Sequence, residues 1–300
     1  MKYLLTGGNG FLGKYLAQSL ISHGELIQLG RATQSDIVAD FSQELPPLPV
    51  VDMVIHAAGT AHFIPKTRAE KELFFKVNVQ GTEKLLNRIS ENQKLPKTFV
   101  FISSVAVYGQ EIGDLIKENA PLMGTTPYAL SKIKAEELIL DWGKKHGVTT
   151  FILRLPLIVG GNAPGNLGAM EKAIQAGYYF RVGKGESQKS MVLAKDVAEL
   201  IPTLSGFEGG IYNLTDGVDP RISELDSAIA AKAKKSVKVV PLALIQPFAK
   251  LGDLFSILPI NTYRLEKLIG QLTFDCTKAK TELKWSPNPV LGWFFEQKHD

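Results

Sequence analysis

The first 160 residues alternate between short, nearly continuous apolar runs and longer stretches with helical spacing of apolar positions. Short apolar runs are typical of parallel strands that are buried on both faces. The pattern predicts strands at 2–5, 26–29, 52–56, 98–103 and 149–154, with helices between them, notably over 69–92 and 127–146. Strands that alternate with helices form a parallel sheet covered on both faces, so we expect an α/β protein of the doubly wound type.

One later stretch, from Val237 to Ile260, is strongly apolar but does not fit a membrane-spanning helix. Three prolines, Lys250 and Asp253 interrupt it, whereas a spanning helix needs roughly 20 predominantly apolar residues in succession. We expect a helix that covers part of the substrate side. A peripheral contact with a membrane-bound partner is the alternative.

Composition narrows the class of protein. Hydrophobic residues make up 45% of the chain and charged residues 21%, which is ordinary for a globular protein and argues against disorder. The net charge of +4 includes no long run of like charges, so no nucleic-acid partner is indicated. The single cysteine, Cys276, excludes an internal disulfide and suits a reducing cytosol. Because a strand is predicted from residue 2, we expect no signal peptide and a cytoplasmic protein.

Tyr128 and Lys132 carry the clearest candidate chemistry. They are four residues apart at the start of a predicted helix, so both side chains project from one face. A tyrosine phenol titrates near about 10, and a lysine ammonium one turn away would lower its pKa. Ser104 offers a hydroxyl that could orient a substrate alcohol or carbonyl. Such a set interconverts an alcohol and a ketone, which requires a hydride carrier; no metal ion is expected.

A glycine-rich turn directly follows the first predicted strand. Its glycines are Gly7, Gly10 and Gly13, and helical spacing begins at Lys14. Glycines let the backbone approach a pyrophosphate closely, and the N-terminus of a helix offers free N–H groups. Strand, turn and helix in this order are the context that a dinucleotide site requires.

Ten short segments along nearly the whole chain match one known family in the same order. They are TGGNGFLG at 6–13, VADF at 38–41, HAAG at 56–59, NVQGT at 78–82, SSVAVYG at 103–109, YALSK at 128–132, RLPLIVGG at 154–161, GNLGAM at 165–170, KSMVLAKDVA at 189–198 and LKWSPNP at 283–289. On these segments the chain resembles the extended short-chain dehydrogenase/reductases of the NAD-dependent epimerase/dehydratase type, and especially their nucleotide-sugar branch. The resemblance implies a Rossmann-type dinucleotide-binding domain over 1–160. It also implies a smaller, mixed substrate-binding cap over 161–300, with 192–214 returning to the large domain.

The resemblance further implies a catalytic set and a set of cofactor contacts. The catalytic set is Ser104, Tyr128 and Lys132, and the cofactor would also lie against Gly7, Gly10, Phe11, Leu12, Gly13, Asp40, Phe41, Ala57, Ala58, Gly59, Asn78 and Pro156. Asp40 would lie near the adenine amino group; a loop or helix-cap aspartate is the alternative. His56 is interpreted as a packed histidine, Ser103 as a strand-end serine and Tyr108 as structural.

Two departures from the family pattern bear on the reaction and the cofactor. Val105 and Ala106 stand where the dehydratase branch carries an Asp-Glu pair, and dehydration is disfavoured because elimination needs an acid and a base. At the end of the second strand, where NAD-preferring members carry an acidic residue, this chain has Gly30 and Arg31. An arginine can pair with a 2′-phosphate. NADP is therefore slightly favoured over NAD, and a solvated surface arginine is the alternative.

On the substrate side, Asn166 and Leu167 match the family's Asn-Leu pair before a helix, where the diphosphate of a UDP-sugar is held. Lys189 stands where a related branch carries a basic residue for phosphate. Thr60 and His62, just past the HAAG segment, are the candidates to reach the sugar ring.

These observations predict an enzyme that acts at C4 of a UDP-hexose or UDP-N-acetylhexosamine with NAD or NADP. The resemblance favours a 4-epimerase, whereas Arg31 favours an NADPH-dependent reductase of a UDP-4-keto-sugar. A non-catalytic NAD(P)-sensing module is the alternative from another class, because function does not follow from fold. The complete set of Ser104, Tyr128 and Lys132 argues against that module.

Self-association is expected as well. Members of the family often form homodimers through two helices, which here would be those at 69–92 and 127–146. Such a contact would explain Phe74 and Leu85 if these side chains prove exposed on the single chain.

Overall fold

In the computed structural model, which describes residues 1–61, 63–254 and 261–296, a seven-stranded parallel sheet forms the centre of the molecule. In spatial order its strands are β3 (Ile37–Val38), β2 (Glu25–Gly30), β1 (Lys2–Thr6), β4 (Met53–His56), β5 (Thr98–Ser104), β7 (Thr149–Leu155) and β11 (Gly210–Asn213). All five strands expected from the apolar runs lie in this sheet. The prediction of a doubly wound α/β fold is confirmed.

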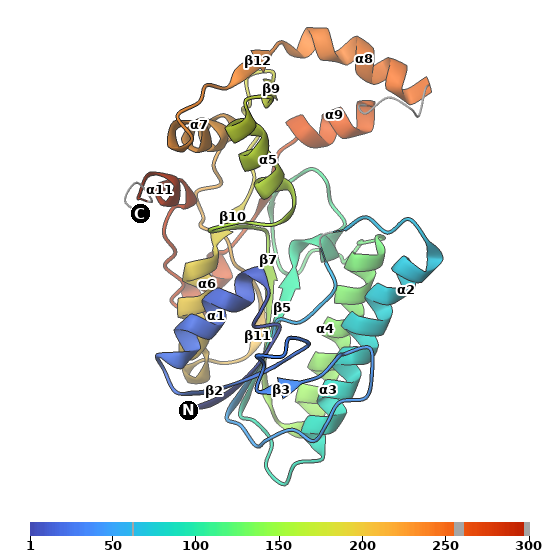
Figure 1. Ribbon diagram of the computed structural model, residues 1–300, viewed down its shortest axis with the longest axis vertical. Helices are drawn as coiled ribbons and strands as arrows, with labels where there is room; N and C mark the ends of the chain where they lie inside the picture. The colour runs from blue at the N-terminus through green and yellow to red at the C-terminus, as the bar shows by residue number, and fades with distance from the viewer. Residues whose placement is uncertain (62, 255–260, 297–300) are drawn as a thin grey trace.

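Helices cover both faces of the sheet (Figure 1). One face carries α1 (Phe11–Ile21) and α6 (Ala194–Leu200), and the other carries α3 (Gly81–Ser90) and α4 (Pro127–His146). Two hydrophobic cores result, one around Leu16 of α1 and one around Ile139 of α4, and both side chains are fully buried. Strands enclosed in this way need apolar side chains on both faces, which is why they are continuous apolar runs in the sequence.

The helix expected over 69–92 consists of three parts. It begins as α2 (Arg68–Phe75), passes through a π-helical turn at Lys76–Gln80 and continues as α3. Phe74 and Leu85 are 1% and 0% exposed. Both side chains pack within their own chain, so the condition under which they would indicate a dimer surface is not met.

The smaller C-terminal part begins after β7, which β8 (Leu157–Val159) follows almost directly, and the chain returns to the sheet once more at β11. It contains α5 (Gly165–Ala176), α7 (Ile222–Lys232), α8 (Leu242–Leu254), α9 (Thr262–Ile269), α10 (Thr277–Glu282) and α11 (Val290–Glu296). Three small parallel ladders join it together: β8 with β10 (Met191–Leu193), β9 (Phe180–Val182) with β12 (Lys238–Val240), and β6 (Gly113–Ile116) with β13 (Leu272–Phe274). In Figure 1, α5, α7, α8 and α9 lie together above the sheet.

The apolar stretch from Val237 contains β12 and α8, and its last part, 255–260, lies outside the described residues. Within the described ranges, no helix has the length and apolar character needed to cross a membrane.

Candidate active site

The crossover in strand order creates the crevice in which the candidate site lies. β1 and β4 are neighbours, and the chain runs outward from them in opposite directions, so ligands are expected at their carboxyl ends. Gly7, just after β1, has φ +76°, and a Cβ there would lie only 2.7 Å from the Ala57 carbonyl carbon and from the Ala58 nitrogen. The turn and the segment after β4 therefore touch through backbone atoms, and only glycine fits at position 7.

The same turn opens α1 in a form that fits a dinucleotide diphosphate. The Gly10 N–H donates to the Gly7 carbonyl over 2.9 Å, and a Cβ on Gly13 would lie 2.0 Å from that carbonyl oxygen. Within the part of the chain that the structure describes, no side chain caps α1 at Gly10. The N–H groups of Phe11, Leu12 and Gly13 are therefore available to an anion at the helix N-terminus.

The predicted contacts for the adenosine half separate into exposed and buried groups. Arg31 is exposed just after β2, and Asp40 is half-buried. The Ser42 N–H donates to the Asp40 carboxylate over 2.7 Å; this bond, aided by the Arg31 charge, lowers the pKa of Asp40. The Phe41 ring is buried and stacks on His56 at 5.5 Å between centroids. At position 41 only the backbone is placed to meet a cofactor.

His56 is a packed histidine. Its two ring nitrogens lie 2.7 Å from Thr6 Oγ1 and 2.9 Å from Thr82 Oγ1. Burial lowers the pKa of His56 to about 3, and the charge of Lys132 acts in the same direction. A neutral imidazole held on both sides within the core does not serve as an acid or base for a substrate.

The start of α4 presents Tyr128. Thr126 caps the helix by accepting from the Ala129 N–H over 3.2 Å, and Pro127 occupies the first turn, where its missing N–H costs nothing. The Tyr128 ring meets Phe74 edge to face. Burial raises the pKa of the Tyr128 phenol, and its hydrogen bond with Ser104 partly opposes that rise. The expected lowering of this pKa is therefore wrong for this structure, because burial outweighs the polar contacts.

Lys132 lies one turn further along α4 and is 5% exposed. Its Nζ donates to the Ile102 carbonyl over 2.8 Å and lies 4.4 Å from the centroid of the Phe101 ring. Burial lowers the pKa of Lys132 to about 8, and the charge of Glu136 opposes this shift. A Cβ on Gly59 would lie 3.6 Å from this Nζ, so the loop after β4 closes over the ammonium.

Asn78 joins that loop to α4. Its side-chain amide donates to Ser131 Oγ over 2.9 Å and to the Thr60 carbonyl over 3.1 Å, while its Oδ1 accepts from the Thr60 N–H over 2.7 Å. The π-helical turn contains Asn78, and such turns are frequent at functional sites. Asn78 therefore positions the Thr60 loop against the helix that carries the tyrosine. Sequence reasoning missed Ser131, for which the only signal is its place inside YALSK.

A buried ion pair lies below the site. The Arg154 guanidinium pairs with Glu136 at 2.6 Å, and both residues are 2% exposed. Ser103 donates to the same carboxylate, and Arg154 donates to the Tyr108 hydroxyl over 3.1 Å. Ser103 and Tyr108 are thus structural, as expected. Glu136 went unnoticed in the sequence, although its spacing of four from Lys132 places it on the same helix face.

The predicted substrate contacts come from separate segments of the chain. Asn166 is exposed in the first turn of α5, whereas the side chain of Leu167 is buried, so only its backbone can meet a ligand. Lys189 is half-buried, and its Nζ donates to the Lys267 carbonyl over 3.3 Å. Thr60 lies in the loop held by Asn78, and His62 lies outside the described residues.

Pro156, Val105 and Ala106 follow directly after strands of the sheet. Pro156 is half-buried directly after β7, at the carboxyl edge of the sheet. Val105 and Ala106 form the start of a short 3₁₀ turn after Ser104, whose Oγ accepts from the Ala106 N–H over 3.2 Å. The two positions that follow Ser104 therefore carry neither an acid nor a base.

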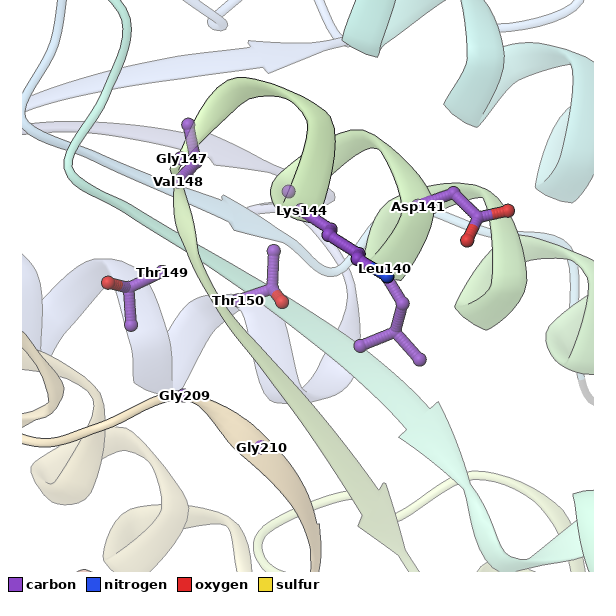
Figure 2. A pocket seen from close by; sticks show the side chains of 10 residues that line it. Leu140, Asp141, Lys144, Gly147, Val148, Thr149, Thr150, Gly209 and Gly210 are labelled. Carbon is purple, nitrogen blue, oxygen red and sulfur yellow. The ribbon is translucent and has the colours of Figure 1, made fainter.

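A hollow of about 550 Å³ lies elsewhere on the molecule. Figure 2 shows its lining side chains from the end of α4, among them Leu140 and Lys144, and from the beginning of β7, including Thr150. It lies at the amino ends of the strands. It is therefore separate from the site at their carboxyl ends.

Known proteins match this chain in sequence and in fold. The model of the NAD dependent epimerase/dehydratase family matches residues 3–214. The N-acetyl-alpha-D-glucosaminyl-diphospho-ditrans,octacis-undecaprenol 4-epimerase of Escherichia coli O157:H7 is 28% identical over 92% of this chain and 88% of its own. The GDP-6-deoxy-D-mannose reductase of Pseudomonas aeruginosa is 28% identical over 80% and 82%. The structure of the UDP-N-acetylglucosamine 4-epimerase of Bacillus cereus matches with a TM-score of 0.74 and 19% identity, and each chain is fully covered.

Proposed function

We propose, from the premise that this chain belongs to the NAD-dependent epimerase/dehydratase family, that it is a 4-epimerase of a sugar diphosphate, with a UDP-hexose or UDP-N-acetylhexosamine as substrate. One observation carries the proposal. The Ser104 side chain at the end of β5 acts on the Tyr128 phenol in the direction that lowers its pKa, and Lys132 lies one turn behind the tyrosine on α4. This is acid/base machinery placed where a dinucleotide binds.

The chain's own residues have separate tasks in this reaction. Tyr128 exchanges a proton with the C4 oxygen of the sugar, and Ser104 orients that oxygen. The positive charge of Lys132 would favour the phenolate, in opposition to the burial that raises the pKa of the Tyr128 phenol. Bound NAD(P) would supply the acceptor and donor for the hydride at C4 of the sugar. Gly7, Gly10 and Gly13 would hold its diphosphate.

The product of this chemistry is limited by positions 105 and 106. Dehydration of the sugar would need a second acid and base beside the catalytic hydroxyl. Val105 and Ala106 supply neither. The reaction therefore stays at C4.

The second candidate is an NADPH-dependent reductase of a 4-keto-sugar. It is favoured by Arg31, which is exposed after β2 where it can meet a 2′-phosphate. One of the two relatives is named as a reductase of a GDP-sugar. The other is named for a sugar that a diphosphate joins to undecaprenol. The sugar diphosphate is thus the part of the substrate that we propose, and UDP is the first carrier to test.

The first experiment is to denature freshly purified protein and identify the nucleotide that it releases. An epimerase returns the hydride to the same carbon, so near-stoichiometric NAD together with interconversion of UDP-N-acetylglucosamine and its C4 epimer would support the proposal. Protein without nucleotide that binds NADPH and reduces a 4-keto-sugar would instead establish the reductase. Bound NAD(P) without turnover of any sugar diphosphate would leave a sensing module and refute both.

Two further features belong to this proposal. We expect a cytoplasmic protein and a homodimer formed through α2 and α4, on which Leu73 and Leu130 are 39% and 37% exposed. Sedimentation of the wild type and of Leu130→Arg tests the dimer. Equal masses for the two proteins would count against this contact.

A further inference from the structure

Helices α8 and α9 form a hairpin at the outer end of the C-terminal part (Figure 1). Asp253 of α8 accepts hydrogen bonds from the Thr262 N–H over 3.0 Å and from its hydroxyl over 2.5 Å, which joins the two helices. Their contact face contains Ala249 and Leu265, which are 1% and 5% exposed, with Ile245 packed against them. One face of α8 is therefore buried against α9.

A neighbouring face of α8 is apolar and exposed. Leu244, Phe248 and Leu251 are 60%, 59% and 46% exposed. Their spacing of four and three places them on one side of the helix, and we call these three residues the α8 stripe. Single exposed apolar residues are ordinary on a protein surface. An aligned stripe of them is typical of a surface that contacts a membrane or another protein.

The segment of the chain that contains the stripe carries a net positive charge. Residues 233–270 contain six basic residues (Lys234, Lys235, Lys238, Lys250, Arg264 and Lys267) and two acidic ones (Asp253 and Glu266). Their net charge equals the +4 of the whole chain, so the remainder of the protein is neutral overall. Lys234, Lys235, Lys238 and Lys250 are exposed. Lys250 lies on α8 itself and Lys238 on β12, the strand that precedes it. An apolar helix face on a positively charged segment is complementary to a bilayer that contains anionic lipid.

The hairpin also lies next to the substrate side of the site. The Lys189 Nζ, which is the proposed phosphate contact, donates to the Lys267 carbonyl of α9 over 3.3 Å. Lys267 in turn pairs with Glu111 at 2.6 Å, in the loop before β6. A sugar at Tyr128 whose diphosphate reaches Lys189 would therefore direct the group beyond the diphosphate toward α9.

We propose that the α8–α9 surface rests on an anionic lipid bilayer and lets the enzyme act on a sugar diphosphate whose carrier is a membrane-anchored lipid. This inference rests on the proposed function for its substrate and on the α8 stripe for its membrane contact. The lipid chain stays in the bilayer, and the stripe and its lysines bring the crevice to the headgroups. The chemistry at C4 is the same as for a UDP-sugar.

The test of the membrane contact is flotation with vesicles of phosphatidylglycerol and phosphatidylethanolamine, compared with vesicles of phosphatidylcholine alone. The wild type should float with the anionic vesicles. Phe248→Ser should lower the affinity roughly tenfold or more, because it removes one large apolar side chain from the bilayer contact. Lys250→Gln should lower it roughly fivefold on the anionic vesicles only. Ile21→Ser, at a 63% exposed apolar position at the end of α1, is the matched control and should float like the wild type.

The test of the substrate is the rate of C4 epimerisation of a polyprenyl-diphosphate N-acetylhexosamine in these vesicles, beside that of the UDP-linked sugar in solution. Phe248→Ser should lower kcat/KM for the lipid-linked sugar alone, and an unchanged unfolding temperature shows that it folds. A wild type that fails to float with anionic vesicles overturns the inference. The inference is also overturned if sedimentation shows that Phe248→Ser converts a dimer into a monomer. The stripe would then be an interface between two copies of this chain. Flotation that depends on the stripe, with turnover of neither sugar, supports the membrane surface and instead refutes the proposed function.

Discussion

The buried ammonium of Lys132 should make the stability of the protein depend on pH, and replacement by methionine should remove that dependence. Burial lowers the pKa of Lys132 from 10.5 to about 8 in the folded chain. At any pH between these two values the unfolded chain holds the proton more firmly than the folded chain does. Stability of the wild type therefore rises with pH across this window.

The size of the effect follows from the two pKa values. Their difference corresponds to a cost of about 3 kcal/mol for the charged form at neutral pH, and most of it should disappear by about pH 9.5. Methionine also removes the hydrogen bond to the Ile102 carbonyl, at 2.8 Å, which costs about 1–3 kcal/mol at every pH. We therefore expect the free energy of unfolding of Lys132→Met, relative to wild type, to fall by on the order of 2 kcal/mol between about pH 7 and about pH 9.5.

Urea unfolding followed by tryptophan fluorescence at the two pH values measures this difference. Lys134→Met removes an exposed lysine from the same helix and is the control; its difference from wild type should be the same at both values. Turnover of Lys132→Met should fall by at least about 100-fold, because the charge behind the phenol is lost. If the two unfolding differences for Lys132→Met agree within error, the reasoning about its burial is refuted.

Three other substitutions test the site. Tyr128→Phe should keep nucleotide affinity while kcat falls by at least about 100-fold, and persistent turnover would contradict its role. Gly13→Ala should lower both stability, by roughly 1–3 kcal/mol, and nucleotide affinity, because its Cβ would lie 2.0 Å from the Gly7 carbonyl oxygen. Gly206→Ala, where nothing lies within 4 Å, is its control in calorimetry. Arg31→Ala should weaken NADPH binding relative to NADH by roughly tenfold or more, the scale of a charge-assisted hydrogen bond, and an unchanged ratio in a titration would exclude Arg31 as the selector.

Much of the fold could be predicted because local signals agree with one another along the chain. The strand at 2–5, the glycine turn and the helix after it follow from residues that are adjacent in sequence. Tyr128 and Lys132 were found in the same way, since their spacing alone places them on one helix face. The partner serine lies at the end of β5 rather than on α4, and the resemblance to a family was needed to select Ser104 over Ser103.

Features that depend on distant contacts could not be predicted. The π-helical turn around Asn78 coincides with bonds to Thr60 and Ser131, which are 18 and 53 residues away. The burial of Phe74 depends on distant contacts as well, because its ring packs on Phe63 and against Tyr128. The pKa of Tyr128 depends on its burial, which the sequence does not encode locally.

The ion pair of Arg154 and Glu136 shows how the fold distinguishes two adjacent serines. A buried pair of this kind contributes little net stability, because removing both charges from water costs about as much as their attraction returns. Its position matters more, since Glu136 accepts a hydrogen bond from Ser103 and so holds that side chain on one face of β5. Successive side chains of a strand point to opposite faces. Because Ser103 is held toward the ion pair, Ser104 points away from it, so the buried charges favour Ser104 over Ser103 as the hydroxyl that acts with Tyr128 in the proposed reaction.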